Sequence, residues 1–146
     1  MNFGNAKVIP TVVRIESYDA ELIRDLYART GVKIDRPNRA FFQDSRNILL
    51  VCMLGEEPAG YLYAYILPAV EDERPRCHIY SLDVFEEYRR RGLGIRLIEA
   101  VKAIAVQHKC RKVFCVTNKS NVAAVGLLAK ANAVTEHDDD VVFVFR

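Results

Sequence analysis

Residues 82 to 94 read LDVFEEYRRRGLG and form the most informative segment of the chain. A strand-like apolar run ends here, a short acidic turn follows, and two glycines spaced two apart open a helix. The first N–H groups of a helix lack intrahelical partners and its dipole is positive there, so this turn attracts an anion. Glycine lets the backbone approach a phosphate closely, and three consecutive arginines add charge suited to a polyphosphate. The segment therefore predicts an anion-binding strand–turn–helix.

Two familiar phosphate-binding motifs do not fit this turn. A P-loop needs Lys followed by Ser or Thr after its last glycine, whereas Ile95 and Arg96 follow Gly94. A dinucleotide fingerprint needs a small residue at position 97 and an acid about 20 residues further on, where the chain has Leu97 and Lys112. A solvated arginine face without a ligand is the plain alternative.

Hydrophobic patterns predict the elements on either side of this turn. A helix is expected after a cap at Ser17 or Asp19 and ends near Gly31, and a short second one follows Pro37. Strands are expected over residues 8–15, 48–54, 59–67, 78–84, 113–117, 133–136 and 141–145, and helices over 93–108 and 121–130. Strand–helix–strand units require parallel pairing, so we predict a single α/β domain over residues 1–146, a mixed sheet with helices on both faces.

The composition limits the class of protein. The chain has 146 residues, of which 51% are hydrophobic and 27% are charged, enough apolar material for one packed domain. A net charge of +2 argues against a nucleic-acid partner. No apolar stretch approaches the ~20 residues of a membrane span, and the N-terminus lacks the layout of a signal peptide. We therefore expect a cytoplasmic protein with no membrane partner.

The four cysteines are Cys52, Cys77, Cys110 and Cys115. No pair has the CxxC spacing of a zinc site or a redox motif, and each lies in or beside an apolar run. We expect reduced structural thiols and no metal cofactor.

The motif Arg89-x-x-Gly92-x-Gly94, preceded by Leu82-x-Val84 and an acidic turn, resembles the acetyl-CoA-binding motif of the GNAT superfamily of N-acetyltransferases. The helix over 121–130 keeps the spacing of the helix that follows in that family. A finer similarity, to the aminoglycoside 3-N-acetyltransferases, rests on scattered residues within 64–80 and 113–121. The resemblance implies an acyl-CoA N-acyltransferase-like fold and acetyl-CoA as the acetyl donor.

The resemblance also implies roles for individual residues. The main chain of Leu82, Asp83 and Val84 would pair with the pantetheine arm of CoA, and an amide there would polarise the thioester carbonyl. Asn121 would hydrogen-bond the amide chain of the cofactor. The backbone amides that would hold the CoA pyrophosphate are those of Arg89, Arg90, Arg91, Gly92, Leu93 and Gly94.

Two positions depart from the family pattern. Leu128 stands where the family most often has the tyrosine that protonates the leaving thiolate, which also favours a non-catalytic CoA-binding module as an alternative. The thiolate of a thiol with a pKa of ~8.5 is a fair leaving group, so catalysis can survive without that acid. Asn132-Ala133 replaces the usual Gly-Phe, and Asn tolerates the left-handed conformation that stops a helix.

Three side chains near the predicted turn are candidates for catalysis. Regular alternation puts His78, Tyr80 and Leu82 on one face of their strand and Ser81 with Asp83 on the other. His78 has an ordinary pKa suited to a general base, Asp83 is a second candidate base, and Tyr80 is a substitute for the missing acid. Each has the alternative reading of a packed or solvated structural residue.

The expected function is direct acetyl transfer from acetyl-CoA to a primary amine of a small cationic substrate, aminoglycoside- or polyamine-like. A peptide or protein amine is the alternative. Acidic side chains at 71–73 and 136–140 either attract such a cation or simply keep the surface soluble. The apolar run 141–145 is a candidate contact for a homodimer.

Overall fold

The computed structural model of the protein describes residues 8–146. Its internal contacts divide it into two compact units, which meet in the sequence between Val116 and Thr117. The single domain expected over residues 1–146 therefore stays a prediction. No helix within residues 8–146 has the length and apolar character needed to cross a membrane.

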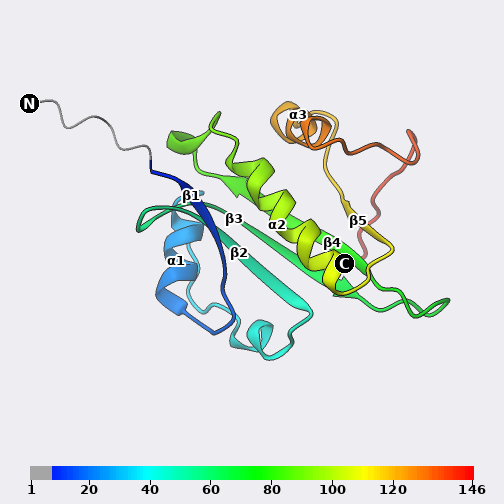
Figure 1. The fold of residues 1–146 in the computed structure, drawn as a ribbon, viewed down its shortest axis with the longest axis horizontal. Helices are drawn as coiled ribbons and strands as arrows, with labels where there is room; N and C mark the ends of the chain where they lie inside the picture. The colour runs from blue at the N-terminus through cyan, green and yellow to red at the C-terminus, as the bar shows by residue number, and fades with distance from the viewer. Residues whose placement is uncertain (1–7) are drawn as a thin grey trace, which may run out of the picture. The chain divides into compact units, whose positions relative to one another are not determined.

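A five-stranded sheet in the order β1-β2-β3-β4-β5 forms the centre of the first unit (Figure 1). The first four strands pair antiparallel, and β5 pairs parallel with β4, which confirms the predicted mixed sheet. The parallel pair requires a crossover, and α2 (Leu93–Gln107) provides it. The strands are β1 (Pro10–Arg14), β2 (Asn47–Leu54), β3 (Glu57–Leu67), β4 (Arg76–Val84) and β5 (Lys112–Cys115).

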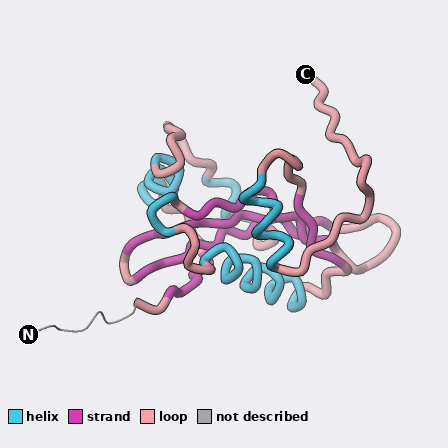
Figure 2. The backbone as a smooth tube through the Cα atoms, turned by 90° about the horizontal axis from the view of Figure 1, so that it is seen from above, coloured by secondary structure: helices cyan, strands magenta, loops and turns pink. Residues whose placement is uncertain are grey.

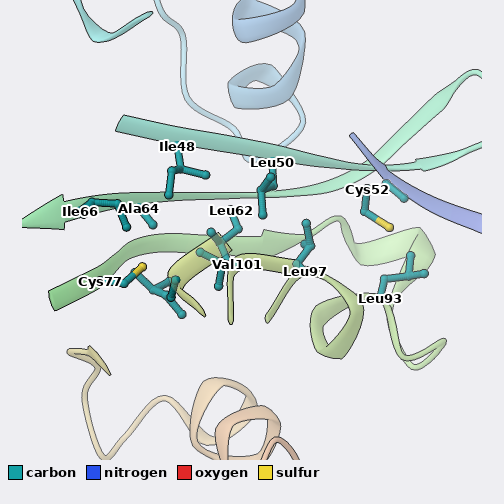
Figure 3. Packing of buried hydrophobic residues seen from close by; sticks show 13 residues of the cluster. Ile48, Leu50, Cys52, Leu62, Ala64, Ile66, Cys77, Leu93, Leu97 and Val101 are labelled. Atoms are coloured by element: carbon teal, nitrogen blue, oxygen red, sulfur yellow. The ribbon is translucent and has the colours of Figure 1, made fainter. Parts of the chain in front are cut away.

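One face of the sheet packs against α2 through aliphatic side chains (Figure 3). Alternate residues of β2 and β3 point to this face, and Leu93, Leu97 and Val101 of α2 pack on them. Leu97 and Val101 are fully buried, so this helix is fixed firmly across the strands. Its first turn, where the anion site is expected, is held in place by Leu93.

The opposite face packs against α1 (Ala20–Ala28) and is rich in aromatic rings. Asp19 caps this helix by accepting a hydrogen bond from the Leu22 amide at 3.0 Å, as the sequence predicted. Ile23 and Leu26 are buried against β2 and β3. Two short 3₁₀ helices, η1 (Arg39–Gln43) and η2 (Glu86–Tyr88), lie in the connections. Helices therefore cover both faces, as expected.

The second unit, residues 117–146, contains α3 (Val122–Lys130), which has no buried residue. The strands expected over 133–136 and 141–145 are wrong: the described residues 131–146 form no strand, and Figure 2 draws them as loop. A strand needs a partner edge, and β-branched composition alone does not supply one. The side chains of 141–145 are 68% to 98% exposed, and their homodimer contact stays a prediction.

Candidate active site

The strand β4 is paired on both edges along its first half only. β5 pairs with it from Arg76, opposite Lys112, to Ile79, opposite Cys115, and then ends. Residues 80–84 continue on the edge of β3, and within the described residues no strand pairs with their other edge. Unpaired backbone groups on a strand edge are a template for an extended ligand. This open edge lies where the sequence expected the pantetheine arm.

A β-bulge at Tyr80 separates the two halves of β4. Tyr63 of β3 pairs with Ser81 and the next residue, Ala64, pairs with Ile79, so Tyr80 has no partner on β3. An extra residue of this kind bends its strand and increases the local twist. The bulge therefore turns β4 at the residue that follows its last pair with β5.

The bulge also corrects the predicted faces of β4. Paired residues share a face, and Leu82 pairs with Leu62 in the aliphatic core under α2. His78 pairs with Tyr65, and Asp83 pairs with Tyr61, on the aromatic face. The expectation that His78 and Leu82 share a face, opposite to Asp83, is wrong because the extra residue shifts the alternation by one.

The turn after β4 supplies the expected helix start. Gly92 has φ +75° and precedes α2 as its N-cap, and Arg90 also has a positive φ of 65°. No described side chain caps the first turn of α2, and that turn carries no acidic residue. Its free N–H groups and the positive end of the dipole therefore remain available to an anion.

The arginines of this turn have different local roles. Arg89 donates a hydrogen bond from Nε to the Val84 carbonyl at 2.8 Å, and its guanidinium lies 3.6 Å from the Asp83 carboxylate. The Arg91 guanidinium lies 5.7 Å from the centre of the Tyr88 ring. Arg89 thus fastens the turn to the end of the open edge and engages the Val84 carbonyl.

The catalytic candidates lie together on the aromatic face. The His78 ring stacks on Phe114 of β5 with centroids 4.6 Å apart, and it lies edge-on to Tyr80 at 5.9 Å. Burial lowers the pKa of His78, so its imidazole is neutral at neutral pH and able to accept a proton. Burial raises the pKa of Asp83, and Arg89 opposes that shift.

The aromatic neighbours of these candidates were not predicted from the sequence. Tyr61, Tyr63 and Tyr65 alternate along β3 and all point to this face, with Tyr63 stacked on Tyr80 at 5.1 Å. The pattern Tyr-x-Tyr-x-Tyr was visible in the sequence. It would have indicated a tyrosine-lined sheet surface beside β4.

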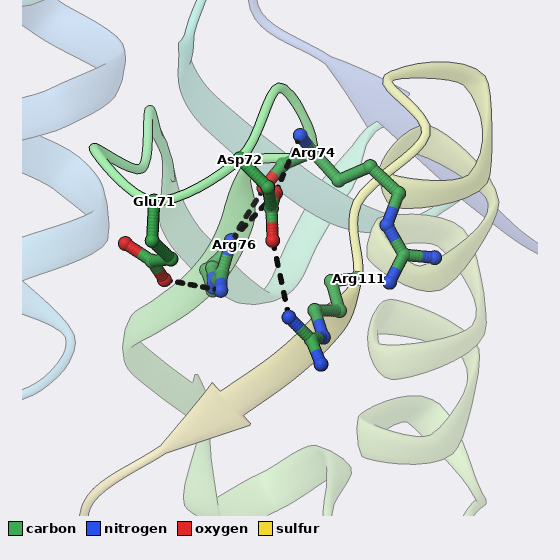
Figure 4. A network of polar contacts seen from close by, with 5 residues as sticks. All are labelled: Glu71, Asp72, Arg74, Arg76 and Arg111. Carbon is green, nitrogen blue, oxygen red and sulfur yellow. Dashed lines mark hydrogen bonds and ion pairs between the residues drawn. The ribbon is translucent and has the colours of Figure 1, made fainter.

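The acidic loop before β4 is engaged within the protein (Figure 4). Asp72 accepts hydrogen bonds from the side chains of Arg76 and Arg111 and from the Arg74 amide, and Glu71 pairs with Arg76. A hollow of about 690 Å³ beside this loop is lined in part by His108 and lies at the opposite end of β4 from the open edge. Two of the three carboxylates of this loop, which was one of the two acidic segments expected to attract a cation, therefore already have partners.

The second unit holds the remaining predicted residues. The Asn121 side chain caps α3 by accepting a hydrogen bond from the Ala124 amide at 3.1 Å. Asn132 has φ 64° and follows the end of α3, which confirms the left-handed stop predicted at this position. Leu128 is half-buried in α3. The role of Asn121 toward the cofactor stays a prediction.

The four cysteines are unbridged. Burial raises the pKa of each thiol, in the case of Cys77 to about 12. A nucleophilic cysteine needs the opposite shift, toward the thiolate. These side chains therefore act as small packing residues and offer no activated nucleophile for a covalent acyl-enzyme.

Solved structures share this fold. An aminoglycoside acetyltransferase, meta-AAC0020, from an uncultured soil metagenomic sample, in complex with sisomicin, has a TM-score of 0.82 at 22% identity, covering 94% of this chain and 95% of that chain. AAC(6')-Iy, in complex with the bisubstrate analogue CoA-S-monomethyl-acetylneamine, has a TM-score of 0.76 at 20% identity, covering 94% and 98%. A ribosomal-protein-alanine N-acetyltransferase from Brucella melitensis biovar Abortus 2308 has a TM-score of 0.74 at 16% identity, covering 92% of this chain and 99% of that chain. None of the curated proteins compared with the chain matches it.

Within this fold, an open strand edge and an uncapped, arginine-flanked helix start suit an extended anionic ligand. The family model described as Acetyltransferase (GNAT) family matches residues 16–133. Because this match spans most of the chain, the protein belongs to the GNAT family. It is an N-acetyltransferase, and acetyl-CoA is its acetyl donor.

Proposed function

We propose that the protein transfers the acetyl group directly to a primary amine of a small cationic molecule, in the cytoplasm. The observation that supports this most is the open edge of β4 at 80–84, which ends beside the uncapped start of α2. A neutral histidine beside the open edge suits an amine that must be deprotonated before attack. The aminoglycoside acetyltransferases of the same fold support a small-molecule acceptor.

Acetyl-CoA supplies the acetyl group as a thioester. In this proposal the backbone amides of 89–94 bind its pyrophosphate, because they lie at the start of α2 with a positive dipole behind them. The main chain of 82–84 binds the pantetheine arm, with the Val84 carbonyl reserved for Arg89. Asn121 binds the amide chain of the cofactor through the amide nitrogen that helix capping leaves free.

The protons move through side chains of the aromatic face. The C–N bond forms while the C–S bond breaks, and His78 accepts the proton that the amine loses. Asp83 is the second candidate base, since burial shifts its pKa upward. The Tyr80 hydroxyl donates a proton to the leaving thiolate, because Leu128 has none to give. Together these transfers leave the product amide, free CoA and a neutral site after proton exchange with water.

Two measurements on the same samples test the proposal. Acetyl-CoA is expected to raise the melting temperature, and thiol release is then followed with an aminoglycoside, a polyamine, a small primary monoamine and short peptides. Release with a small cationic amine supports the proposal. Release with peptides alone contradicts it and favours a peptide or protein acceptor, which the structural neighbour acting on ribosomal-protein alanine would then explain.

A further inference from the structure

A row of aromatic rings crosses three strands beside the open edge. The Tyr80 ring stacks on Tyr63 with centroids 5.1 Å apart and planes 25° apart, and Tyr65 lies edge-on to it at 5.9 Å. His78 continues the row at 5.9 Å from Tyr80 and stacks on Phe114. We call these five side chains, Tyr63, Tyr65, His78, Tyr80 and Phe114, the aromatic platform.

Tyr80 is the solvent-exposed side chain of the platform. Tyr63 covers one face of its ring, yet 60% of the residue is exposed. Among the large hydrophobic side chains exposed within residues 8–116, it is the one aromatic ring, since the others are aliphatic. Large aromatic rings are usually buried on folding, so a ring left open on an aromatic surface is suited to stack with a ligand.

The position of Tyr80 connects the platform with the chemistry. It is the bulged residue, and it directly follows Ile79, the last residue of β4 to pair with β5. The open backbone edge begins at this point, and His78, the proposed base, contacts the Tyr80 ring. A ligand on the open face of Tyr80 therefore lies beside both the unpaired edge and the histidine.

The charges nearby do not suit a polycation. Asp83 is the one carboxylate that β4 carries, and Arg89 lies 3.6 Å from it. The acidic loop before β4 lies at the other end of the strand, and its Glu71 and Asp72 are paired with arginines. On β4, a molecule with several ammonium groups has only this one carboxylate to pair with, whereas a ring with a single amine can stack on the aromatic side chains.

We propose that the aromatic platform is the acceptor subsite and that it selects amines joined to an aromatic ring by a short aliphatic chain. The inference rests on the proposed function and narrows its substrate class. The substrate ring stacks on the open face of Tyr80, and the chain carries the amine toward His78 and the open edge. Acetyl transfer then proceeds with the bond and proton changes given above.

The test compares 2-phenylethylamine with 2-cyclohexylethylamine, which has the same chain and charge but no aromatic ring. The wild-type protein is expected to favour the aromatic amine about tenfold in kcat/KM, the range of a specific ring-stacking contact. Tyr80→Phe is expected to keep this ratio while lowering kcat for both amines, because the ring remains and the hydroxyl is lost. Tyr80→Leu is expected to bring the ratio close to one.

Tyr18→Leu is the matched control, because Tyr18 contacts Phe42 and Arg39 outside the platform. It is expected to leave the ratio unchanged. A wild-type kcat/KM ratio near one for the two amines overturns the proposal that the platform is the acceptor subsite. A Tyr80→Leu ratio equal to that of wild type overturns it as well. Faster turnover of spermidine or an amino sugar also overturns it and leaves the proposed function standing. Acetyl-CoA binding without turnover of any amine overturns both.

Discussion

The two halves of β4 differ in what holds them. The first half, 76–79, lies between β3 and β5, and the Asp72 network joins its start to β5 through Arg76 and Arg111 (Figure 4). The second half, 80–84, pairs with β3 alone and ends at the hydrogen bond that Arg89 donates to the Val84 carbonyl. One strand therefore combines a part closed by protein with a part left open for a ligand, and the bulge at Tyr80 divides them.

The rigid part of β4 and the part that is open to a ligand are therefore different segments of the same strand. The closed half has its backbone groups satisfied by two neighbours, so its position is determined by the protein alone. The open half is positioned by its one neighbour and by the aliphatic core beneath Leu82. A bound ligand can then complete the pairing without displacing a strand.

The largest effect is expected from removing the base beside the open half. His78→Gln should lower kcat about 100-fold, the usual contribution of a positioned general base. The wild-type kcat should fall on acidification with an apparent pKa below 6.5, because burial lowers the pKa of His78 and only the neutral ring accepts a proton. The variant should lose this acid limb.

A pH–rate profile of both proteins, with His108→Gln as control, measures this effect. His108 lies at the C-terminal end of α2 and contacts neither Tyr80 nor Phe114 among the ring contacts of the described residues. Its replacement should leave the profile unchanged. An acid limb that persists in His78→Gln would assign the proton to another group, with Asp83 the next candidate.

The next effect concerns the turn that follows the open half. Gly92→Val should weaken acetyl-CoA binding about tenfold or more, because φ +75° costs an L residue roughly 1–2 kcal/mol and the turn must move. Gly31→Val is the matched control: its φ is +82°, it also has no atom within 4 Å of an added Cβ, and it follows α1.

Calorimetric titration with acetyl-CoA compares these two variants with wild type. Both should lose similar stability, and Gly92→Val alone should lose affinity. Equal affinity in a folded Gly92→Val protein would remove this turn from the binding site. Gly94 is less useful for such a test because it is buried in the first turn of α2, where added bulk would disturb the core.

The local parts of this account were predictable from the sequence. The start of α2, the cap at Asp19 and the left-handed Asn132 follow from short-range chemistry, and the structure has each of them. Such features depend on residues within one turn of the chain. The residues themselves therefore carry the signal.

The parts that depend on strand pairing were not predictable. The bulge at Tyr80 arises from the register between β3 and β4, and no residue pattern within 78–84 marks it. Without it, alternation assigned the wrong faces to Leu82 and Asp83. The runs 133–136 and 141–145 have the composition of strands, but pairing requires an edge that local sequence does not specify.

The smallest effect is expected at the closed half. Asp72→Asn should lower the melting temperature slightly at pH 7 and leave acetyl-CoA affinity unchanged, because the partly exposed ion pairs of Asp72 only join the loop to the start of β4 and to Arg111, just before β5. Its partners lower the pKa of Asp72, so its contribution is present above the ordinary value of 3.8 and is lost as the pH falls below it. Melting curves of both proteins should therefore converge on acidification. An Asp72→Asn protein with reduced acetyl-CoA affinity would contradict the conclusion that only the second half of β4 binds the cofactor.

Amide hydrogen exchange along β4, measured with and without CoA, distinguishes the open half of the strand from the closed half. CoA is expected to increase protection within 80–84 and to leave 76–79 unchanged, because only the second half has an edge free to pair with the ligand. Unchanged exchange at 80–84 in a CoA-saturated sample, or an equal increase in both halves, would contradict it.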